Sequence, residues 1–307
     1  MNVGGQAVIE GVMMRSPHAI ATAVRLPDGS IELRKQTYQS FTQRYPFLNI
    51  PILRGAINFF EMLSIGVDTL NWSADIQMKY SDQESAEKKK KHSFWNTLAL
   101  WGSIVFAFVF GMGVFFALPI FIATLLGLTK GALIFNLEAG VIRIGLFFLY
   151  IFLISRMPDI KRVFRYHGAE HMSIFTLESR ETLDICAARE KSRFHPRCGT
   201  SFILIVAIFS IILFGFADSL FPSIFGHLQS FPERLLTHLS LLPFVAGLSY
   251  ELLKLSGRFR SNGFVKFLIA PGLWLQTMTT AEPDDEMLEV ALCALKAAIG
   301  QEETAQP

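Results

Sequence analysis

The sequence predicts an α-helical integral membrane protein with about four transmembrane helices and a small cytoplasmic N-terminal α+β segment. Two observations lead to this fold class. First, 51% of the 307 residues are hydrophobic and 29 are Phe, with a mean hydropathy of +0.39, values above those of typical soluble domains. Second, the chain contains several apolar runs of the roughly 20 residues that an α-helix needs to cross a bilayer.

Four of these runs are predicted to span the membrane. The first is the clearest, because residues 93–129 contain no Asp, Glu, Lys or Arg. Pro119 is expected to kink this span or to mark its outer end. The expected spans are Thr97–Leu126, Leu133–Ser155, Ser201–Phe221 and Leu235–Leu253.

Basic residues near the span ends predict the orientation, because cytoplasmic loops carry an excess of Lys and Arg. Lys88–Lys91 precede the first span, and nine Lys or Arg lie in residues 156–200. The two opposite loops hold only Lys130 and Arg234. Both termini and the central segment are therefore expected on the cytoplasmic side.

Turn and helix signals divide the rest of the chain. Pro27-Asp28-Gly29 lies between two strand-like runs and predicts a hairpin. Polar residues recur at helical spacing from Arg54 to Asp75, which predicts an amphipathic helix on the bilayer or on other helices. The predicted segments are 1–45 with the β-hairpin, 46–80 as an amphipathic or re-entrant helix, 81–96 as a charged linker, 97–155 with transmembrane helices 1 and 2, 156–200 as a cytoplasmic loop, 201–254 with transmembrane helices 3 and 4, and 255–307 as an interfacial segment followed by a C-terminal amphipathic helix.

The segment His167-Gly168-Ala169-Glu170-His171 is the main candidate for chemistry. The pattern HxxEH places two imidazoles one turn apart on one helix face, with a carboxylate beside them. Two such imidazoles can bind a divalent metal, and the carboxylate can act as general base on metal-bound water. The alternative interpretation is a pair of packed or surface histidines with Glu170 as a surface charge.

Three residues are candidates to complete the metal shell. His195 and Cys198 follow in one short cluster, and Glu251 lies near the cytoplasmic end of the fourth span. If His195 and Cys198 both bind, the metal has four protein ligands and a closed, structural site; if only one binds, a position stays open for water or substrate. Cysteine sulfur favours zinc, or iron and copper, over magnesium. The predicted cofactor is therefore a divalent metal, zinc first, unless the cluster is only a turn packed under the third span.

Two further charged residues need an explanation. Glu10 follows a glycine-rich start, so it either reaches the metal or the substrate, or pairs with a base such as Arg15. Arg143 lies inside the second span, where an ionised side chain normally faces a polar interior. We interpret Arg143 as part of an interhelical ion pair, with Asp218 of the third span as a candidate partner, or as a residue nearer the end of its span than drawn. Glu138, five residues away on the same helix, is an imperfectly placed partner. The alternative is a proton or substrate path.

Several motifs together resemble the bacterial YqhQ-like family: Gly4–Arg15, His167–His171, His195–Ser201, Ala270–Gln276 and Thr279–Asp284. This family is a domain of unknown function that carries the label of a predicted metal-dependent enzyme. The resemblance implies a multi-pass protein of the bacterial cytoplasmic (inner) membrane. It supplies no substrate.

These observations lead to one functional prediction with two alternatives. The prediction is a zinc-type hydrolase at the cytoplasmic membrane face, acting on membrane-proximal peptide bonds, lipid headgroups or cytoplasmic esters. The alternatives are a non-enzymatic scaffold or assembly factor with a structural metal, and a transporter with Arg143 in its path. The expected partner is membrane lipid. A net charge of only +2 gives no electrostatic case for nucleic acid, and the sequence specifies no protein partner.

Overall fold

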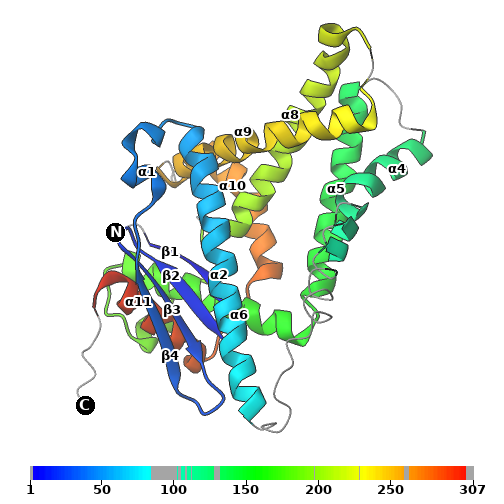
Figure 1. Ribbon diagram of the computed structural model, residues 1–307. Helices are drawn as coiled ribbons and strands as arrows, with labels where there is room; N and C mark the ends of the chain where they lie inside the picture. The colour runs from blue at the N-terminus through cyan, green and yellow to red at the C-terminus, as the bar shows by residue number, and fades with distance from the viewer. Residues whose placement is uncertain are drawn as a thin grey trace. The chain divides into compact units, whose positions relative to one another are not determined.

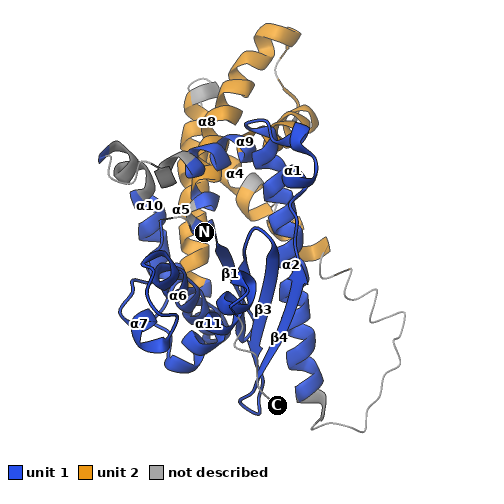
Figure 2. Cartoon of the chain, turned by 90° about the vertical axis from the view of Figure 1, so that its left-hand side faces the viewer, with its two compact units in different colours: residues 1–84, 154–204, 246–307 blue, residues 85–153, 205–245 orange. Residues whose placement is uncertain are grey.

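A computed structural model gives the fold of the chain (Figure 1). It describes residues 3–83, 102, 105–107, 109–111, 113–127, 132–196, 198–227, 229–258 and 263–301. Most of the predicted charged linker 81–96, with its tandem lysines, lies outside the described residues. The chain forms two compact units (Figure 2), unit 1 with residues 1–84, 154–204 and 246–307, and unit 2 with residues 85–153 and 205–245.

The N-terminal part of unit 1 is a four-stranded antiparallel sheet in the order β1-β2-β3-β4. Its strands are β1 (Gly4–Val8), β2 (Gly11–Arg15), β3 (Ala19–Arg25) and β4 (Ile31–Thr37). The predicted hairpin is confirmed as β3 and β4, and Gly29 in its turn has the positive φ of 88° that favours glycine. A tight turn at Ile9 and Glu10 joins β1 to β2.

The remaining elements are helices. They are α1 (Phe41–Arg44), the 3-10 helix η1 (Pro46–Leu48), α2 (Leu53–Gln83), the π-helical turn η2 (Gly113–Ala117), α4 (Leu118–Leu125), α5 (Ala132–Ile154), α6 (Pro158–Glu178), α7 (Ile185–Arg189), α8 (Gly199–Phe225), α9 (Phe231–Arg258), α10 (Gly263–Thr279) and α11 (Asp285–Ile299).

Helices cover both faces of the sheet, so its central strands are buried on both sides. Met13 and Val24 pack with Ile76 of α2 in one core. The neighbouring residue Met14 points the other way and joins a second core that includes Leu288 of α11. Side chains of a strand alternate between faces, and here both faces are apolar. Strand β2 therefore shows no polar alternation in its sequence.

The amphipathic helix that the sequence predicts from Arg54 to Asp75 is α2. It contacts another helix, α9, where Arg54 pairs with Glu251, and it also packs on the sheet. One apolar face of α2 lies on the sheet, where Met62, Ile65 and Trp72 pack against the core that includes Ile76. The opposite face leaves large apolar side chains exposed, among them Phe60, Leu63 and Val67.

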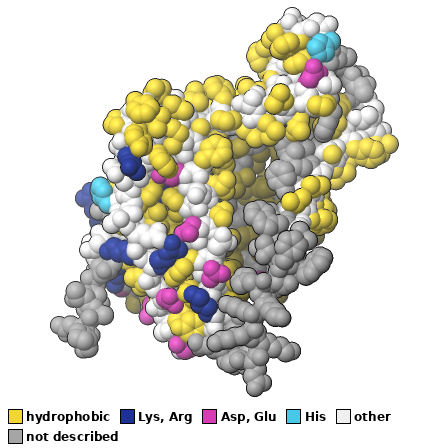
Figure 3. All heavy atoms as spheres, viewed as in Figure 1, with side chains coloured by type: hydrophobic (Ala, Val, Ile, Leu, Met, Phe, Trp, Pro, Cys, Tyr) yellow, Lys and Arg dark blue, Asp and Glu magenta, His cyan; other side chains and the backbone are white. Residues whose placement is uncertain are grey.

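Within the part of the chain that the structure describes, four helices are long and apolar enough to cross a membrane: Val105–Leu125, Ile134–Ile154, Phe202–Phe225 and Pro232–Lys254. They match the four predicted spans in number and place, and this coarse part of the prediction is confirmed. Their surfaces carry many exposed hydrophobic side chains (Figure 3), for example Phe106, Phe121 and Leu125. Lipid-facing helices need such surfaces, because their backbone polar groups are satisfied internally and only apolar side chains meet the bilayer.

The region 156–200 between the second and third spans contains α6 and α7, and the HxxEH segment lies on α6, in agreement with its helical spacing. Helix α10 continues through Pro271. The C-terminal helix α11 follows the prediction: Asp284 caps its first turn by accepting from the Met287 N–H (3.0 Å), and Gly300 ends it with φ 76°.

Candidate metal centre

Helix α6 carries the HxxEH segment on its buried face. Met157 has an extended backbone at the N-cap, Pro158 occupies the first turn and Asp159 adds a negative charge there, which is a favourable helix start. Close packing holds the middle of the helix in place. A Cβ at Gly168 would lie 2.2 Å from the Ala281 carbonyl oxygen, so only glycine allows this approach of the chain that follows α10.

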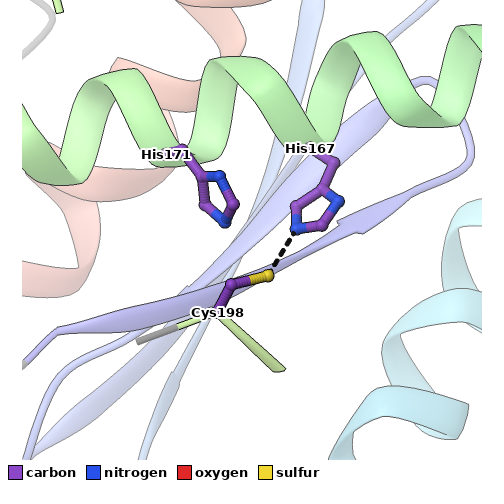
Figure 4. A group of neighbouring side chains, drawn as sticks. All are labelled: His167, His171 and Cys198. Atoms are coloured by element: carbon purple, nitrogen blue, oxygen red, sulfur yellow. Dashed lines mark hydrogen bonds between the residues drawn. The ribbon is translucent and has the colours of Figure 1, made fainter. Parts of the chain in front are cut away.

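The structure brings His167, His171 and Cys198 together (Figure 4). Each offers one ligand atom, and these three atoms lie within 4.8 Å of one another. The two imidazoles project from α6, with ring centroids 4.4 Å apart. Cys198 comes from the short segment before α8, and its Sγ lies 3.2 Å from His167 Nε2. Two nitrogens and one sulfur at these distances can converge on one metal ion.

Backbone carbonyls fix both imidazoles in the form that binds a metal. His167 Nδ1 lies 2.8 Å from the Thr279 carbonyl oxygen, and His171 Nδ1 contacts the Arg193 carbonyl oxygen. A carbonyl oxygen only accepts, so Nδ1 carries the proton and Nε2 of the neutral ring keeps its lone pair. His171 Nε2 is buried and has no hydrogen-bond partner within the described part of the chain. A metal ion bound by this group would satisfy the atom, and a carbonyl on the other ring nitrogen is the usual support for a ligand histidine.

The start of α8 holds the sulfur of Cys198. The Thr200 N–H donates to Sγ at 3.4 Å, and the Thr200 hydroxyl lies 3.1 Å away. The Cys198 N–H itself donates to the His195 carbonyl oxygen at 3.3 Å. The side chain is 5% exposed and in no disulfide. A buried cysteine beside two histidine nitrogens is a chemically suitable ligand for zinc.

Glu170 lies beside this group on the same helix. Its carboxylate is buried, and Oε2 is 3.9 Å from His167 Nε2. Burial raises the pKa of Glu170 to about 7, against the opposing effects of His167 and of the Gly5 backbone N–H. Gly5 of β1 lies directly against the side chain. The sheet therefore shields the carboxylate from water.

His195 lies near the group but outside it. Its ring centroid is 5.6 Å from that of His171, and its Nε2 faces Glu178 Oε1 at 3.6 Å. The buried amide of Gln276 holds the His195 backbone on both sides: Oε1 accepts from the N–H and Nε2 donates to the carbonyl, each at 2.8 Å. The group that comes together is His167, His171 and Cys198, so Cys198, and not His195, is placed as the third candidate ligand.

The two other predicted carboxylates form ion pairs away from the group. Glu251 was expected to approach the histidines, but it accepts two hydrogen bonds from Arg54 of α2, at 2.6 and 2.5 Å. Glu10 pairs with Arg162 of α6 instead of Arg15, with Arg162 Nη2 donating to Oε2 at 2.6 Å. Arg15 donates to the Tyr38 hydroxyl at 3.0 Å. Both carboxylates therefore fix helices and are not among the ligand atoms that converge.

Arg143 belongs to unit 2, and its Nε donates to the Phe115 carbonyl oxygen at 2.8 Å. Asp218, one of its two predicted partners, is bound by Arg234 and His238. Gln276, Gly5 and the carbonyl groups of Thr279 and Arg193 also belong to the surroundings of the site, and no chemical motif in the sequence predicts them. Gly5 and Gln276 lie in two of the motifs on which the family resemblance is based. Their place in these motifs is the one feature of the sequence that indicates them. Backbone carbonyls leave no signal in a sequence.

Comparison with known proteins gives a family and a relative. The profile of a family described as "Protein of unknown function (DUF1385)" matches residues 50–301, so the match includes His167, His171 and Cys198. The chain is 38% identical over 300 residues to "Uncharacterized protein YqhQ" of Bacillus subtilis (strain 168), which covers 94% of this chain and 89% of that protein. No solved structure matches the chain.

Proposed function

This chain belongs to the DUF1385 family of proteins of unknown function, and we propose that it is a membrane-bound, metal-dependent hydrolase of the zinc type. One observation carries the proposal. Three ligand atoms, from His167, His171 and Cys198, lie within 4.8 Å of one another beside the buried carboxylate of Glu170. The family match also confirms the resemblance to the YqhQ-like family that the sequence motifs predict.

The donor set fits zinc better than the common alternatives. Two imidazole nitrogens and one cysteine sulfur form a mixed nitrogen and sulfur site, which zinc prefers and which magnesium and calcium avoid. Three protein ligands leave the fourth tetrahedral position for water or substrate, as in catalytic zinc sites. His195 and Glu251 have other contacts, so this position stays open in the proposed site.

Each residue of the site has a defined task in hydrolysis. A bound ion of this kind supplies an acidified water and polarises a carbonyl or phosphoryl oxygen of the substrate. Glu170 takes up the proton of the attacking water and delivers it to the leaving group. The carbonyl groups of Thr279 and Arg193 hold the two imidazoles in their ligand form. Gly5 and the sheet behind it exclude bulk water from the Glu170 carboxylate.

The chain keeps this site close to membrane-spanning segments. Pro158, the first residue of α6, follows the end of the second span at Ile154 by four residues, and Cys198 precedes the third span at Phe202 by four. With the orientation expected from the basic residues, the site lies at the cytoplasmic face of the bacterial inner membrane. The proposed substrates are therefore membrane-proximal peptide bonds, lipid headgroups or cytoplasmic esters.

A structural metal in a non-enzymatic scaffold is the second candidate, favoured by the burial of the site. His171 is 1% exposed and Glu170 is 5% exposed, which suits a closed site in which Glu170 supports a ligand imidazole. The Glu170→Gln variant separates the two roles. A hydrolase loses turnover and keeps its metal, whereas a scaffold keeps its function and changes only in stability.

Elemental analysis of the purified protein tests the site itself. We expect about one equivalent of zinc in the wild type, as one tetrahedral site requires, and its loss in His167→Ala/His171→Ala. The double variant His18→Ala/His227→Ala is the matched control, because it removes two exposed histidines outside the group. Metal-free wild-type protein from chelator-free preparations would contradict the proposal, and so would zinc that persists in the His167→Ala/His171→Ala variant.

A further inference from the structure

Unit 2 contains a cavity that the proposed hydrolase does not use. Its volume is about 160 Å³, and residues from η2, α4, α5, α8 and α9 line it, so all four membrane-spanning helices contribute. Most of the lining is apolar. The polar lining residues are Asn136, Arg143, Arg234 and His238.

The lining of this cavity is basic. Among the described residues that line it, two are arginines and none is acidic. Asp218 of α8 is buried and is bound from both sides, by Arg234 Nη2 at 2.8 Å and by His238 Nε2 at 2.9 Å. Glu138 follows Asn136 by two residues on α5 but is not part of the lining. The Asp218 carboxylate therefore contacts both Arg234 and His238, and the guanidinium of Arg143 lines the same cavity.

Contacts with neighbouring groups hold the side chains of Arg143 and His238 in fixed positions. Arg143 Nε donates to the carbonyl of Phe115 at 2.8 Å, and Phe115 belongs to the π-helical turn η2. Such turns are rare and occur frequently at functional sites. His238 stacks on Phe214, with ring centroids 4.2 Å apart and planes 7° apart, which directs its Nε2 at Asp218. Specific contacts within unit 2 therefore hold basic side chains of this cavity in place.

We propose that this cavity binds an oxyanion, a phosphate or carboxylate group, within the membrane-spanning part of the protein. An arginine inside a bilayer is costly and is normally kept for a partner or a function. Guanidinium groups bind phosphate and carboxylate oxygens with strong, directional hydrogen bonds. The apolar part of the lining, which includes Ile120, Ile211 and Leu235, suits the hydrocarbon portion of an amphiphile. The oxyanion comes from a phospholipid headgroup or from a soluble phosphate, and the two sources are separable by experiment.

Two probes distinguish these sources with the full-length protein. Phosphatidylglycerol in phosphatidylcholine nanodiscs reports on a lipid phosphate, through native mass spectrometry of the retained lipid. Inorganic phosphate, added to nanodiscs of phosphatidylcholine alone, reports on a soluble anion through the shift in unfolding temperature. We expect one of the two probes to bind the wild type and to bind about 10-fold more weakly to Arg143→Gln and to Arg234→Gln, because each removes a charge-assisted contact.

Matched variants exclude an effect of surface charge or of folding. Arg156→Gln removes an exposed arginine outside the cavity and is expected to bind the probe as the wild type does. Leu235→Trp fills the cavity and leaves every charge in place, so it displaces the probe even if the glutamine variants fail to fold. Zinc content is expected to stay unchanged in all these variants, which separates this proposal from the hydrolase. Absence of binding by both probes to the wild type, or retention of the probe in Leu235→Trp, would overturn the proposal.

Discussion

Gly5 lies directly against Glu170, so the first strand of the sheet forms one wall of the candidate metal centre. A Cβ at Gly5 would stand 2.7 Å from Glu170 Cγ and 2.8 Å from the Met13 carbonyl oxygen. The Gly5 N–H also donates to the Glu170 carboxylate. The N-terminal sheet, remote in sequence from the HxxEH segment, therefore determines the surroundings of the proposed general base.

Replacement of Gly5 tests this relationship. Gly5→Ala is expected to displace Glu170 and to cost about 1–3 kcal/mol of stability, the usual penalty for overpacking a buried site. Gly4→Ala is the matched control, because a Cβ at Gly4 meets nothing within 4 Å. Thermal unfolding of both variants in detergent measures the difference. Equal unfolding temperatures for the two would show that Gly5 does not constrain Glu170.

Cys198 is the cysteine that should control metal affinity. Cys198→Ser replaces the sulfur ligand and is expected to weaken zinc binding by more than the roughly 10- to 100-fold that follows loss of an outer-shell partner. Cys186→Ser and Cys293→Ser are the controls, because neither cysteine belongs to the ligand group. Competition with a zinc-binding dye gives the three affinities. An unchanged affinity for Cys198→Ser would remove sulfur from the site.

Gln276 should support the centre from a distance through the backbone of His195. Gln276→Leu leaves the His195 N–H and carbonyl without their buried partner, and each such group costs about 1–3 kcal/mol. We expect a lower unfolding temperature and weaker zinc binding, because the loop that leads to Cys198 loses its anchor. Gln36→Leu, at an exposed position, should change neither property. Normal stability of Gln276→Leu would indicate that the loop is held by other contacts.

The ion pair of Arg54 and Glu251 should contribute to stability and leave the metal unaffected. A double-mutant cycle with Arg54→Gln and Glu251→Gln is expected to give a coupling of about 1.5–3 kcal/mol, the range for hydrogen bonds to charged groups. Both side chains are about one-fifth exposed, so the lower part of that range is expected. Zinc content of Glu251→Gln should equal that of the wild type. Loss of zinc from the Glu251→Gln variant would instead indicate that Glu251 is a metal ligand.

The sequence predicts the long apolar helices of this fold well, because bilayer thickness requires long apolar runs that composition alone reveals. Spans such as Ile134–Ile154 and Phe202–Phe225 therefore appear within a few residues of their expected bounds. Strands β1 and β2 are harder to predict. They are short, and Val12, Met13 and Met14 are buried on both faces of the sheet, so the two-residue alternation that identifies a strand is missing.

The candidate site is predictable where one helix turn encodes it, and not where distant segments meet. His167, Glu170 and His171 follow from the spacing of HxxEH, because residues four apart share a helix face. The choice among Cys198, His195 and Glu251 depends on long-range contacts. Gln276 orients the backbone before Cys198, and Arg54 binds Glu251. Neither pairing has a local pattern in the sequence.

X-ray absorption spectroscopy at the zinc edge tests the central claim most directly. The purified wild-type protein is expected to show one sulfur at about 2.3 Å and nitrogen or oxygen ligands at about 2.0–2.1 Å, including two imidazoles. This is the shell that His167, His171 and Cys198 form with one open position. A bound metal without sulfur, or with more than one sulfur, would contradict the account.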